Sequence, residues 1–388
     1  MFCSPRMLGL LARVLFFFAV VPRVFARDGL DARIQQMAQS WVEQGQTVGV
    51  VVGVVTAQGK KIYGAGSTSR GSGKRPDGST LFEIGSITKV FTNLLLVDEV
   101  ARGRVTLNDP VTQYLPSSFR FPTRKRPWYL GFLPHPPNKP VCLVHLALHT
   151  SGFPFIVRPS DLPKDWKVTE PDYITLDMLR DFFNRFSFDR DPGERFEYSV
   201  INTGLLALVL TFRERKEYEI LLKERVLDPL GLEDTRVRLS EEQSGRMAQG
   251  YGSNGRALPT IHITETTAGS CGLKSTATDL TRFMDFQLGL RPCALKNELK
   301  EETRPLIMVN SKEGRTLGYD YRQFENGTLI YQDARTMGFR GILALVPDWG
   351  VGVVILGNSE SFDAQKKIES IVQMVLREQL HRTPLSRF

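Results

Sequence analysis

The sequence predicts an α/β fold of the α+β kind, in which one antiparallel five-stranded sheet is flanked by helices and carries an inserted helical lobe. Two observations predict it. Valine- and isoleucine-rich runs, which favour strands, occur near both ends of the chain. Helical periodicity fills most of the middle. Strands from both ends must then share one sheet, so we expect one domain over residues 27–388, with a sheet lobe of about residues 27–105 plus 265–388 and a helical lobe of about residues 106–264.

The predicted strands and their covering helices lie toward the two termini. Residues 30–44 carry apolar side chains on one helical face, and a hairpin is expected from residues 47–56 and 61–65 with a turn at Gln58-Gly59. Three further strands and a closing amphipathic helix are expected at residues 329–332, 339–346, 351–356 and 368–376.

Helices are predicted between these strand regions, over residues 87–104, 144–149 and 173–186, in two further stretches that follow residues 196–206 and end at about residue 231, and over residues 276–288. Ser275 stands where the last of these begins, and a serine hydroxyl there can accept a backbone N–H of the first turn. We therefore expect Ser275 to be its N-cap.

Composition excludes several classes of function. An apolar share of 41% is too high for a disordered chain, and a net charge of +8 is too small and too scattered for a nucleic-acid-binding protein. His145 and His149 are four residues apart, as metal ligands on one helix face are. However, no glutamate follows His145 as the H-E-x-x-H pattern requires, so we predict neither a metal nor a cofactor.

The N-terminal residues have the pattern of a secretory signal peptide. Arg6 precedes an apolar run over residues 7–21, and residues 24–26 end in the small residue of a cleavage site. The run is shorter than the ~20 residues that a membrane-spanning helix needs. We expect residues 1–26 to be cleaved, with an uncleaved membrane anchor as the alternative, and a secreted or membrane-anchored product of the secretory pathway in either case.

Cysteine usage and one sequon are consistent with that compartment. Without Cys3, three cysteines remain, and Cys271 with Cys293 is the candidate disulfide; three unpaired thiols, with Cys142, are the alternative. Asn326 begins an Asn-Gly-Thr glycosylation sequon in a predicted hairpin loop.

Residues 116–140 differ in composition from the rest of the chain. They hold seven prolines, an aromatic pair and a basic group at residues 124–126. Proline at this density prevents a regular element, so we expect a surface excursion. A solvated loop is the simplest interpretation, and a cover for an active site or a contact for an acidic partner is the alternative.

Residues 82–96 contain the candidate catalytic residues Ser86 and Lys89. Apolar side chains from Ile87 to Leu94 recur at helical spacing, so Ser86 and Lys89 stand one turn apart where a buried helix begins. A serine becomes a nucleophile when a nearby base takes its proton, and S-x-x-K is a signature of class A β-lactamases and penicillin-binding proteins. The alternative is that Ser86 only caps the helix.

Four further stations follow in order along the chain. They are His149-Thr150-Ser151-Gly152, Pro192-Gly193-Glu194 leading to Tyr198-Ser199, Gly272-Leu273 with Ser275-Thr276 and Asp279-Leu280, and Thr336-Met337-Gly338-Phe339. With residues 82–89, they give residues 30–380 a resemblance to the serine β-lactamase and penicillin-binding protein family. The chain looks closest to the class C and esterase-like branch, and like a vertebrate β-lactamase-like protein.

The resemblance implies a β-lactamase/transpeptidase-like fold and a set of roles. Ser86 would be the nucleophile, Lys89 the base and Tyr198 the second acid/base. The backbone N–H groups of Ser86 and Arg335 would form the oxyanion hole.

Two stations depart from the family pattern. The second motif usually reads Tyr-x-Asn, and Val200 stands in place of the asparagine; Asn202, about 200° further around the helix, should point elsewhere. The third motif usually reads Lys or His, then Thr or Ser, then Gly. This chain has Gln332, Asp333 and Ala334 there, so it lacks a cation that would favour a neutral Lys89, unless the Arg335 side chain turns inward.

Two functions remain open from the sequence. One is a serine hydrolase that forms an acyl-Ser86 intermediate on a small-molecule or peptide amide or ester. The other is a catalytically impaired binding protein of the same fold, which the altered second and third motifs favour. The sequence names neither the substrate nor the oligomeric state.

Overall fold

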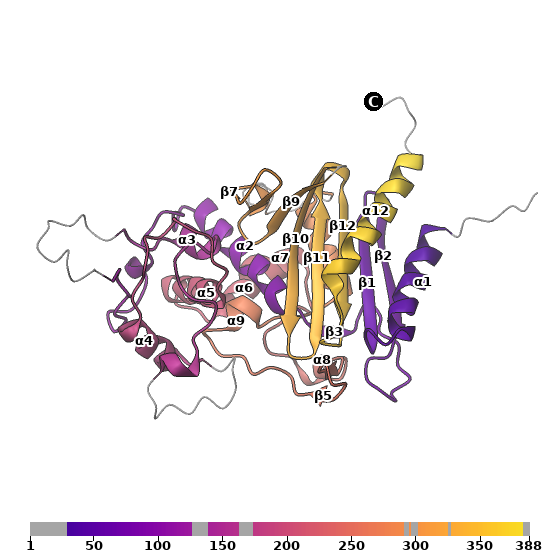
Figure 1. The fold of residues 1–388 in the computed structure, drawn as a ribbon, viewed down its shortest axis with the longest axis horizontal. Coiled ribbons are helices and arrows are strands. Elements are labelled where there is room, and N and C mark those ends of the chain that lie inside the picture. Colours follow the sequence, from indigo (N-terminus) through magenta and orange to yellow (C-terminus); the bar gives the residue numbers. More distant parts are fainter. Residues whose placement is uncertain are drawn as a thin grey trace, which may run out of the picture.

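The computed structural model describes residues 29–125, 139–162, 174–290, 295, 302–324 and 327–382. Its centre is one antiparallel sheet in the order β2-β1-β12-β11-β10-β9-β8-β7 (Figure 1). The strands are β1 (Gly49–Thr56), β2 (Gly59–Gly66), β7 (Ile307–Met308), β8 (Glu313–Arg315), β9 (Asp320–Phe324), β10 (Gly327–Thr336), β11 (Phe339–Val346) and β12 (Val351–Gly357).

The five predicted strands form a continuous part of this sheet, from β2 to β10. The first and last thirds of the chain meet where β1 pairs with β12, with Val52 opposite Ile355. The expected strand number was wrong, because β9, β8 and β7 continue the sheet to eight strands. Two of these are only two or three residues long, too short for the alternating apolar pattern that marks a strand in sequence.

The sheet is buried on both faces. One face packs against α1 (Leu30–Glu43) and α12 (Ala364–Arg382), and the core between them includes Val50, Val52 and Ile355. Alternate residues, such as Val51 and Val354, point to a second core that contains the remaining helices. Burial on both faces explains why β1 and β12 are almost continuously apolar.

The helices of the second core lie mostly on the side of the molecule away from α1 and α12 (Figure 1). They are α2 (Thr88–Ala101), α3 (Leu143–Ala147), α4 (Leu176–Arg185), α5 (Val200–Glu214), α6 (Tyr218–Leu222), α7 (Asp228–Leu230), α8 (Glu241–Ser244), α9 (Ala268–Cys271) and α10 (Ala277–Gln287). Helix α2 is buried on all sides, which is the position of a central helix.

Two short sheets join these parts: β3 (Leu81–Glu83) pairs with β6 (Lys274–Thr276), and β4 (Gly250–Tyr251) pairs with β5 (Ala257–Leu258). The predicted cap of α10 was wrong by one residue, since Thr276 accepts the N–H of Asp279. The Ser275 hydroxyl instead lies 2.9 Å from the Thr235 hydroxyl, because Ser275 is still part of β6.

Several sequence predictions fall on residues outside the described ranges. These are the signal peptide at residues 1–26, Cys293 of the candidate disulfide, the sequon residue Asn326 and most of the proline-rich excursion. They remain predictions. Within the described residues, no helix combines the length and the apolar character required to cross a membrane.

Candidate active site

Ser86 lies in a 3₁₀ turn, Gly85–Ile87, directly before α2. The turn follows strand β3 and packs against the end of β10. A Cβ on Gly85 would come within 3.0 Å of Thr336 Cγ2 and 3.1 Å of the Arg335 carbonyl oxygen, and the φ of Gly85 is +44°. Only glycine tolerates both the contact and the positive φ comfortably. Neither the turn nor α2 has a side-chain cap, so Ser86 is not the N-cap that the alternative interpretation required.

The structure brings the three residues Ser86, Lys89 and Tyr198 into direct contact. Lys89 Nζ donates to Ser86 Oγ over 3.0 Å, and the Tyr198 hydroxyl donates to the same oxygen over 2.8 Å. Lys89 Nζ also lies 5.2 Å from the centroid of the Tyr198 ring. Ser86 is partly exposed, whereas the Lys89 side chain is 1% exposed. The hydroxyl is therefore accessible to a substrate and the amine is shielded from water.

Helix α9 fixes the position of Lys89 from behind. Lys89 Nζ donates to the carbonyl of Ser270 over 2.8 Å. One turn further along α2, the Thr92 hydroxyl donates to the carbonyl of Gly269 over 2.6 Å. These two hydrogen bonds connect α2 to α9 and hold the Lys89 amine within reach of Ser86 Oγ.

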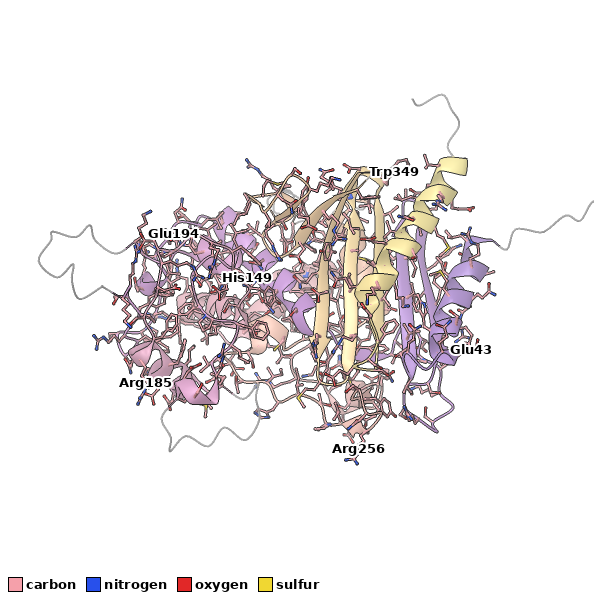
Figure 2. All side chains as sticks on the ribbon, viewed as in Figure 1. Glu43, His149, Arg185, Glu194, Arg256 and Trp349 are labelled. Atoms are coloured by element: carbon pink, nitrogen blue, oxygen red, sulfur yellow. The ribbon has the colours of Figure 1, made fainter. Side chains whose placement is uncertain are left out.

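His149 fixes the ring of Tyr198. The two rings stack with centroids 4.6 Å apart, and Phe155 stacks on Tyr198 from 6.1 Å. His149 Nδ1 accepts the backbone N–H of Ser199 over 3.2 Å, and Asn202 Nδ2 lies 3.4 Å from the same nitrogen. Figure 2 shows His149 well inside the helical part of the molecule.

These positioning roles were not predicted from the sequence. His149 was weighed as a metal ligand and placed in a family station without a role, and Asn202 was expected to point elsewhere. Within the described residues Asn202 has no hydrogen bond to Lys89. It meets the site through His149, and its Oδ1 accepts the Ser151 hydroxyl over 2.6 Å. His145 makes a different contact, accepting the N–H of Cys142. Among the described residues, no three His, Cys, Asp or Glu side chains are grouped as a metal site would need.

Arg315 is a second residue that sequence reasoning missed. It lies in β8, one of the unexpected strands, with its guanidinium 4.0 Å from the centroid of Phe196 and in an ion pair with Asp320. Burial lowers the pKa of His149 far below its usual value, and the charges of Lys89 and Arg315 lower it further. His149 is therefore a neutral imidazole at physiological pH.

We call Lys89, His149, Tyr198 and Asn202 the helix wall of the site. Opposite them, Gln332, Asp333, Ala334 and Arg335 at the end of β10 form the strand wall.

The strand wall offers no cation to the site. Gln332 is buried and, with Lys89, His149 and Arg315, borders a gap of about 10 Å³. Strand alternation turns Asp333 to the opposite face, where it is exposed. The Arg335 side chain is 71% exposed and pairs with Glu360. Arg335 therefore does not turn inward, and Asp333 does not face Lys89.

Val200 changes the character of the space beside Tyr198. It borders a cavity of about 40 Å³ whose other walls are mainly aliphatic: Ile156, Val157, Ile174, Leu179, Ile201, Leu205, Thr266, Thr267 and Cys271. This volume has room for about three non-hydrogen atoms, judged by the 10–15 Å³ that one water needs. Ser86, Lys89 and Tyr198 do not border this cavity, although one of its walls, Cys271, directly follows Ser270, whose carbonyl accepts Lys89 Nζ.

A partly exposed serine, held between a buried amine and a phenol, defines the site of a serine hydrolase class that uses lysine and tyrosine instead of histidine and aspartate. The chain belongs to the β-lactamase family, whose profile matches residues 30–375.

Two characterised relatives illustrate the range of that family. A β-lactamase of Lysobacter lactamgenus is 28% identical over 286 residues, covering 72% of this chain and 66% of the relative. The D-alanyl-D-alanine-carboxypeptidase/endopeptidase AmpH of Escherichia coli is 26% identical over 323 residues, covering 79% of this chain and 78% of AmpH. The chain thus spans slightly less than two thirds of the Lysobacter protein.

Solved structures share the fold at lower identity. A β-lactamase/D-alanine carboxypeptidase of Pseudomonas syringae aligns with a TM-score of 0.75 at 21% identity, covering 92% of this chain and 99% of the other. A class C β-lactamase aligns with a TM-score of 0.75 at 18% identity, covering 92% and 98%. The expected family and β-lactamase/transpeptidase-like fold are confirmed.

Proposed function

We propose that this protein is a serine hydrolase that forms an acyl-Ser86 intermediate on an amide, peptide or ester. One observation carries the proposal: Ser86 Oγ lies 3.0 Å from Lys89 Nζ and 2.8 Å from the Tyr198 hydroxyl. These are the distances over which a proton can leave the serine as it attacks. Family membership supports the same class of chemistry.

The proposed reaction has two steps. Ser86 Oγ bonds to the substrate carbonyl carbon, its proton passes to Lys89 or Tyr198, and the same pair returns a proton to the departing nitrogen or oxygen. Water then attacks the acyl carbon, with a proton passing back to Ser86 Oγ as the ester bond breaks. Developing negative charge on the carbonyl oxygen would be bound by the N–H groups of Ser86 and Arg335, whose backbones approach at Gly85.

The surroundings of Tyr198 suggest which substrates fit. Among the described residues, no charged side chain borders the cavity beside Val200, and Phe155, which stacks on Tyr198, is 56% exposed. We infer that uncharged, apolar substrate groups are favoured on the side of Phe155 and Val200. Val200 cannot donate the hydrogen bond that an asparagine would offer to a substrate amide.

The comparisons lend no support to the alternative of an impaired binding protein. The departures that favoured it are Val200 and residues 332–334 of the strand wall. Within the described residues, none of these side chains has a hydrogen bond to Ser86 Oγ. The groups that must move protons are all present and in contact.

Labelling with a fluorophosphonate probe tests the proposal. Wild-type protein should be labelled, and Ser86→Ala should be labelled at least ~100-fold more slowly. Ser361→Ala is the matched control, because Ser361 is an exposed serine whose hydroxyl contacts only the carbonyl of Gln46. Equal labelling of wild type and Ser86→Ala would exclude the acyl-serine mechanism.

We also propose that the protein enters the secretory pathway, on the strength of its first 26 residues and its sequon. Expression in cultured cells should yield a glycosylated product that loses mass with Asn326→Gln. A cytosolic, unglycosylated product would contradict this proposal without bearing on the chemistry.

A further inference from the structure

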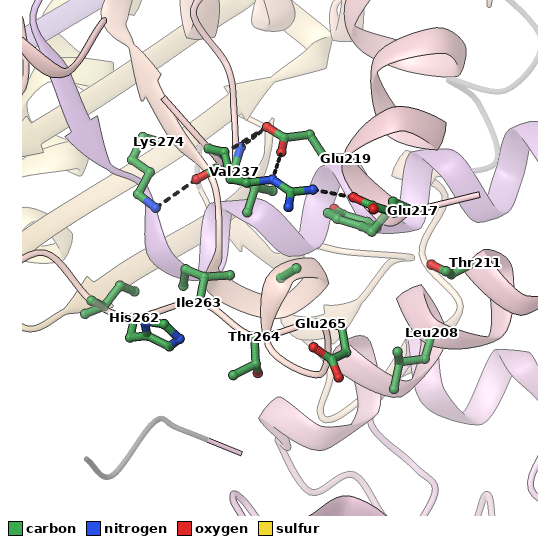
Figure 3. Close-up of a pocket in the computed structure, with 14 residues that line it drawn as sticks. Leu208, Thr211, Glu217, Glu219, Val237, His262, Ile263, Thr264, Glu265 and Lys274 are labelled. Atoms are coloured by element: carbon green, nitrogen blue, oxygen red, sulfur yellow. Dashed lines mark hydrogen bonds and ion pairs between the residues drawn. The ribbon is translucent and has the colours of Figure 1, made fainter. Parts of the chain in front are cut away.

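A second cavity lies outside the candidate active site. Its volume is about 500 Å³, within the range of small-molecule pockets. Helices α5, α6 and α9, strand β6 and residues 261–265 supply its walls (Figure 3). None of Ser86, Lys89 and Tyr198 borders it.

Two cationic side chains border this cavity, and of these Arg238 is exposed and paired with Glu217, whereas Lys274 is buried. The side chain of Lys274 borders the cavity but is only 6% exposed. Its Nζ donates to the carbonyl of Val237 over 3.0 Å, the single hydrogen bond recorded for it in the described part of the chain (Figure 3). An ammonium has three N–H donors, so two remain available. Burial lowers the pKa of Lys274, an effect that the charges of Glu83 and Glu219 only partly offset.

The acidic side chains of the cavity do not compete for this cation. Glu219 accepts the N–H groups of Val237 and Arg238 over 2.8 and 2.9 Å, and it also pairs with the Arg238 guanidinium. Glu217 pairs with the same guanidinium. Glu265 is exposed, so water screens its charge.

The walls of the cavity are mixed. Besides the charged residues, Thr211, Tyr218, His262 and Thr264 supply polar side chains. Its aliphatic walls are Leu208, Val237, Ile261, Ile263 and Ala268. An interior of this kind, with a single buried ammonium, complements a ligand that has one anionic end and an apolar body. A carboxylate is the anion that would use the free N–H donors of Lys274.

We propose that this cavity binds a small monocarboxylate with an apolar body, whose carboxylate meets Lys274 Nζ. Hydrogen bonds connect a wall of this cavity to the helix that positions Lys89. Tyr218, on its wall, lies 2.7 Å through its hydroxyl from that of Thr92, which in turn bonds to the carbonyl of Gly269. The next carbonyl, of Ser270, accepts the catalytic amine of Lys89. A ligand against Tyr218 and Ala268 thus contacts the same short helix that positions Lys89.

Calorimetric titration of the folded protein with sodium alkanoates tests this site. Affinity should rise about fourfold for each added CH₂ between acetate and hexanoate, as expected for a buried methylene. Neutral 1-hexanol, with the same apolar body, should bind at least ~10-fold more weakly than hexanoate. Ser86→Ala should bind hexanoate like wild type, because Ser86 is not part of the cavity.

Substitutions locate the binding. Lys274→Met should weaken hexanoate binding at least ~10-fold, while Lys216→Met should not, since Lys216 does not border the cavity and pairs with Glu224. If Lys274→Met does not fold, Thr211→Trp fills the cavity from the partly exposed end of α5 and should abolish binding. Unchanged binding in folded Lys274→Met or in Thr211→Trp, equal binding of hexanol and hexanoate, or loss of binding in Ser86→Ala would overturn the proposal.

Discussion

The two walls of the site differ in how their side chains are held. On the helix wall, Lys89 and Asn202 are almost fully buried and hydrogen-bonded, and His149 holds Tyr198 by stacking. On the strand wall, the Gln332 side chain donates to the carbonyl of its own neighbour Asp333, and the Asp333 side chain faces outward. Proton transfer requires contact distances and a fixed geometry, which the helix wall supplies. Substrate recognition depends on side chains that can change without moving that geometry.

The largest expected effect lies on the helix wall. Lys89→Met and Tyr198→Phe should each lower kcat/KM at least ~100-fold, because each removes one of the two groups in contact with Ser86 Oγ. Steady-state hydrolysis of a small activated ester measures it, with circular dichroism as the check on folding. A loss of less than ~3-fold in Tyr198→Phe would mean that the phenol only positions the serine.

A charge introduced on the inner side of the strand wall should have the next largest effect. Gln332→Glu places a carboxylate in the gap shared with Lys89 and should lower kcat/KM about 10-fold, because it stabilises the protonated amine. Gln332→Met, a neutral side chain of similar length, is the matched control and should stay within about 3-fold of wild type. Equal losses in both variants would point to packing and not to charge.

The sequence predicted the elements with strong periodicity and missed those without it. Helix α2 and the five strands from β2 to β10 are long, apolar and clearly patterned, so their existence followed from spacing alone. Strands β7 and β8 are too short for any pattern. Arg315 was missed for the same reason, since it reaches the site from β8.

The contact between Ser86, Lys89 and Tyr198 was also predictable, partly from helical spacing and partly from the family resemblance. The supporting contacts were not. His149 and Asn202 are 53 residues apart, and only the folded chain brings the two rings of His149 and Tyr198 together. Strand alternation could have placed Gln332 and Asp333 on opposite faces, but which face meets Lys89 depends on how β10 pairs with β11.

The stability of the folded protein should depend on pH through His149, a residue of the helix wall. Its pKa is lowered in the folded state, so below about pH 6.5 the unfolded chain binds a proton that the folded chain does not. Stability should therefore fall by up to ~1.4 kcal/mol per pH unit below that value. Between about pH 7.5 and 5.5, urea unfolding of wild type should lose ~1 kcal/mol more than that of His149→Phe, which keeps an aromatic ring beside Tyr198. Parallel losses in the two proteins would contradict a buried neutral His149.

The smallest effect is expected one residue beyond Gln332. Asp333→Asn should leave kcat/KM within about twofold, because the Asp333 side chain is exposed and strand alternation turns it away from Lys89. It removes a carboxylate from the outer face, whereas Gln332→Glu adds one to the inner face of the same strand. The two variants thus compare the effect on Lys89 of a charge on the outer face of β10 with that of a charge on its inner face. A tenfold change in Asp333→Asn, assayed on the same ester, would show that the outer face of the strand wall also meets the substrate.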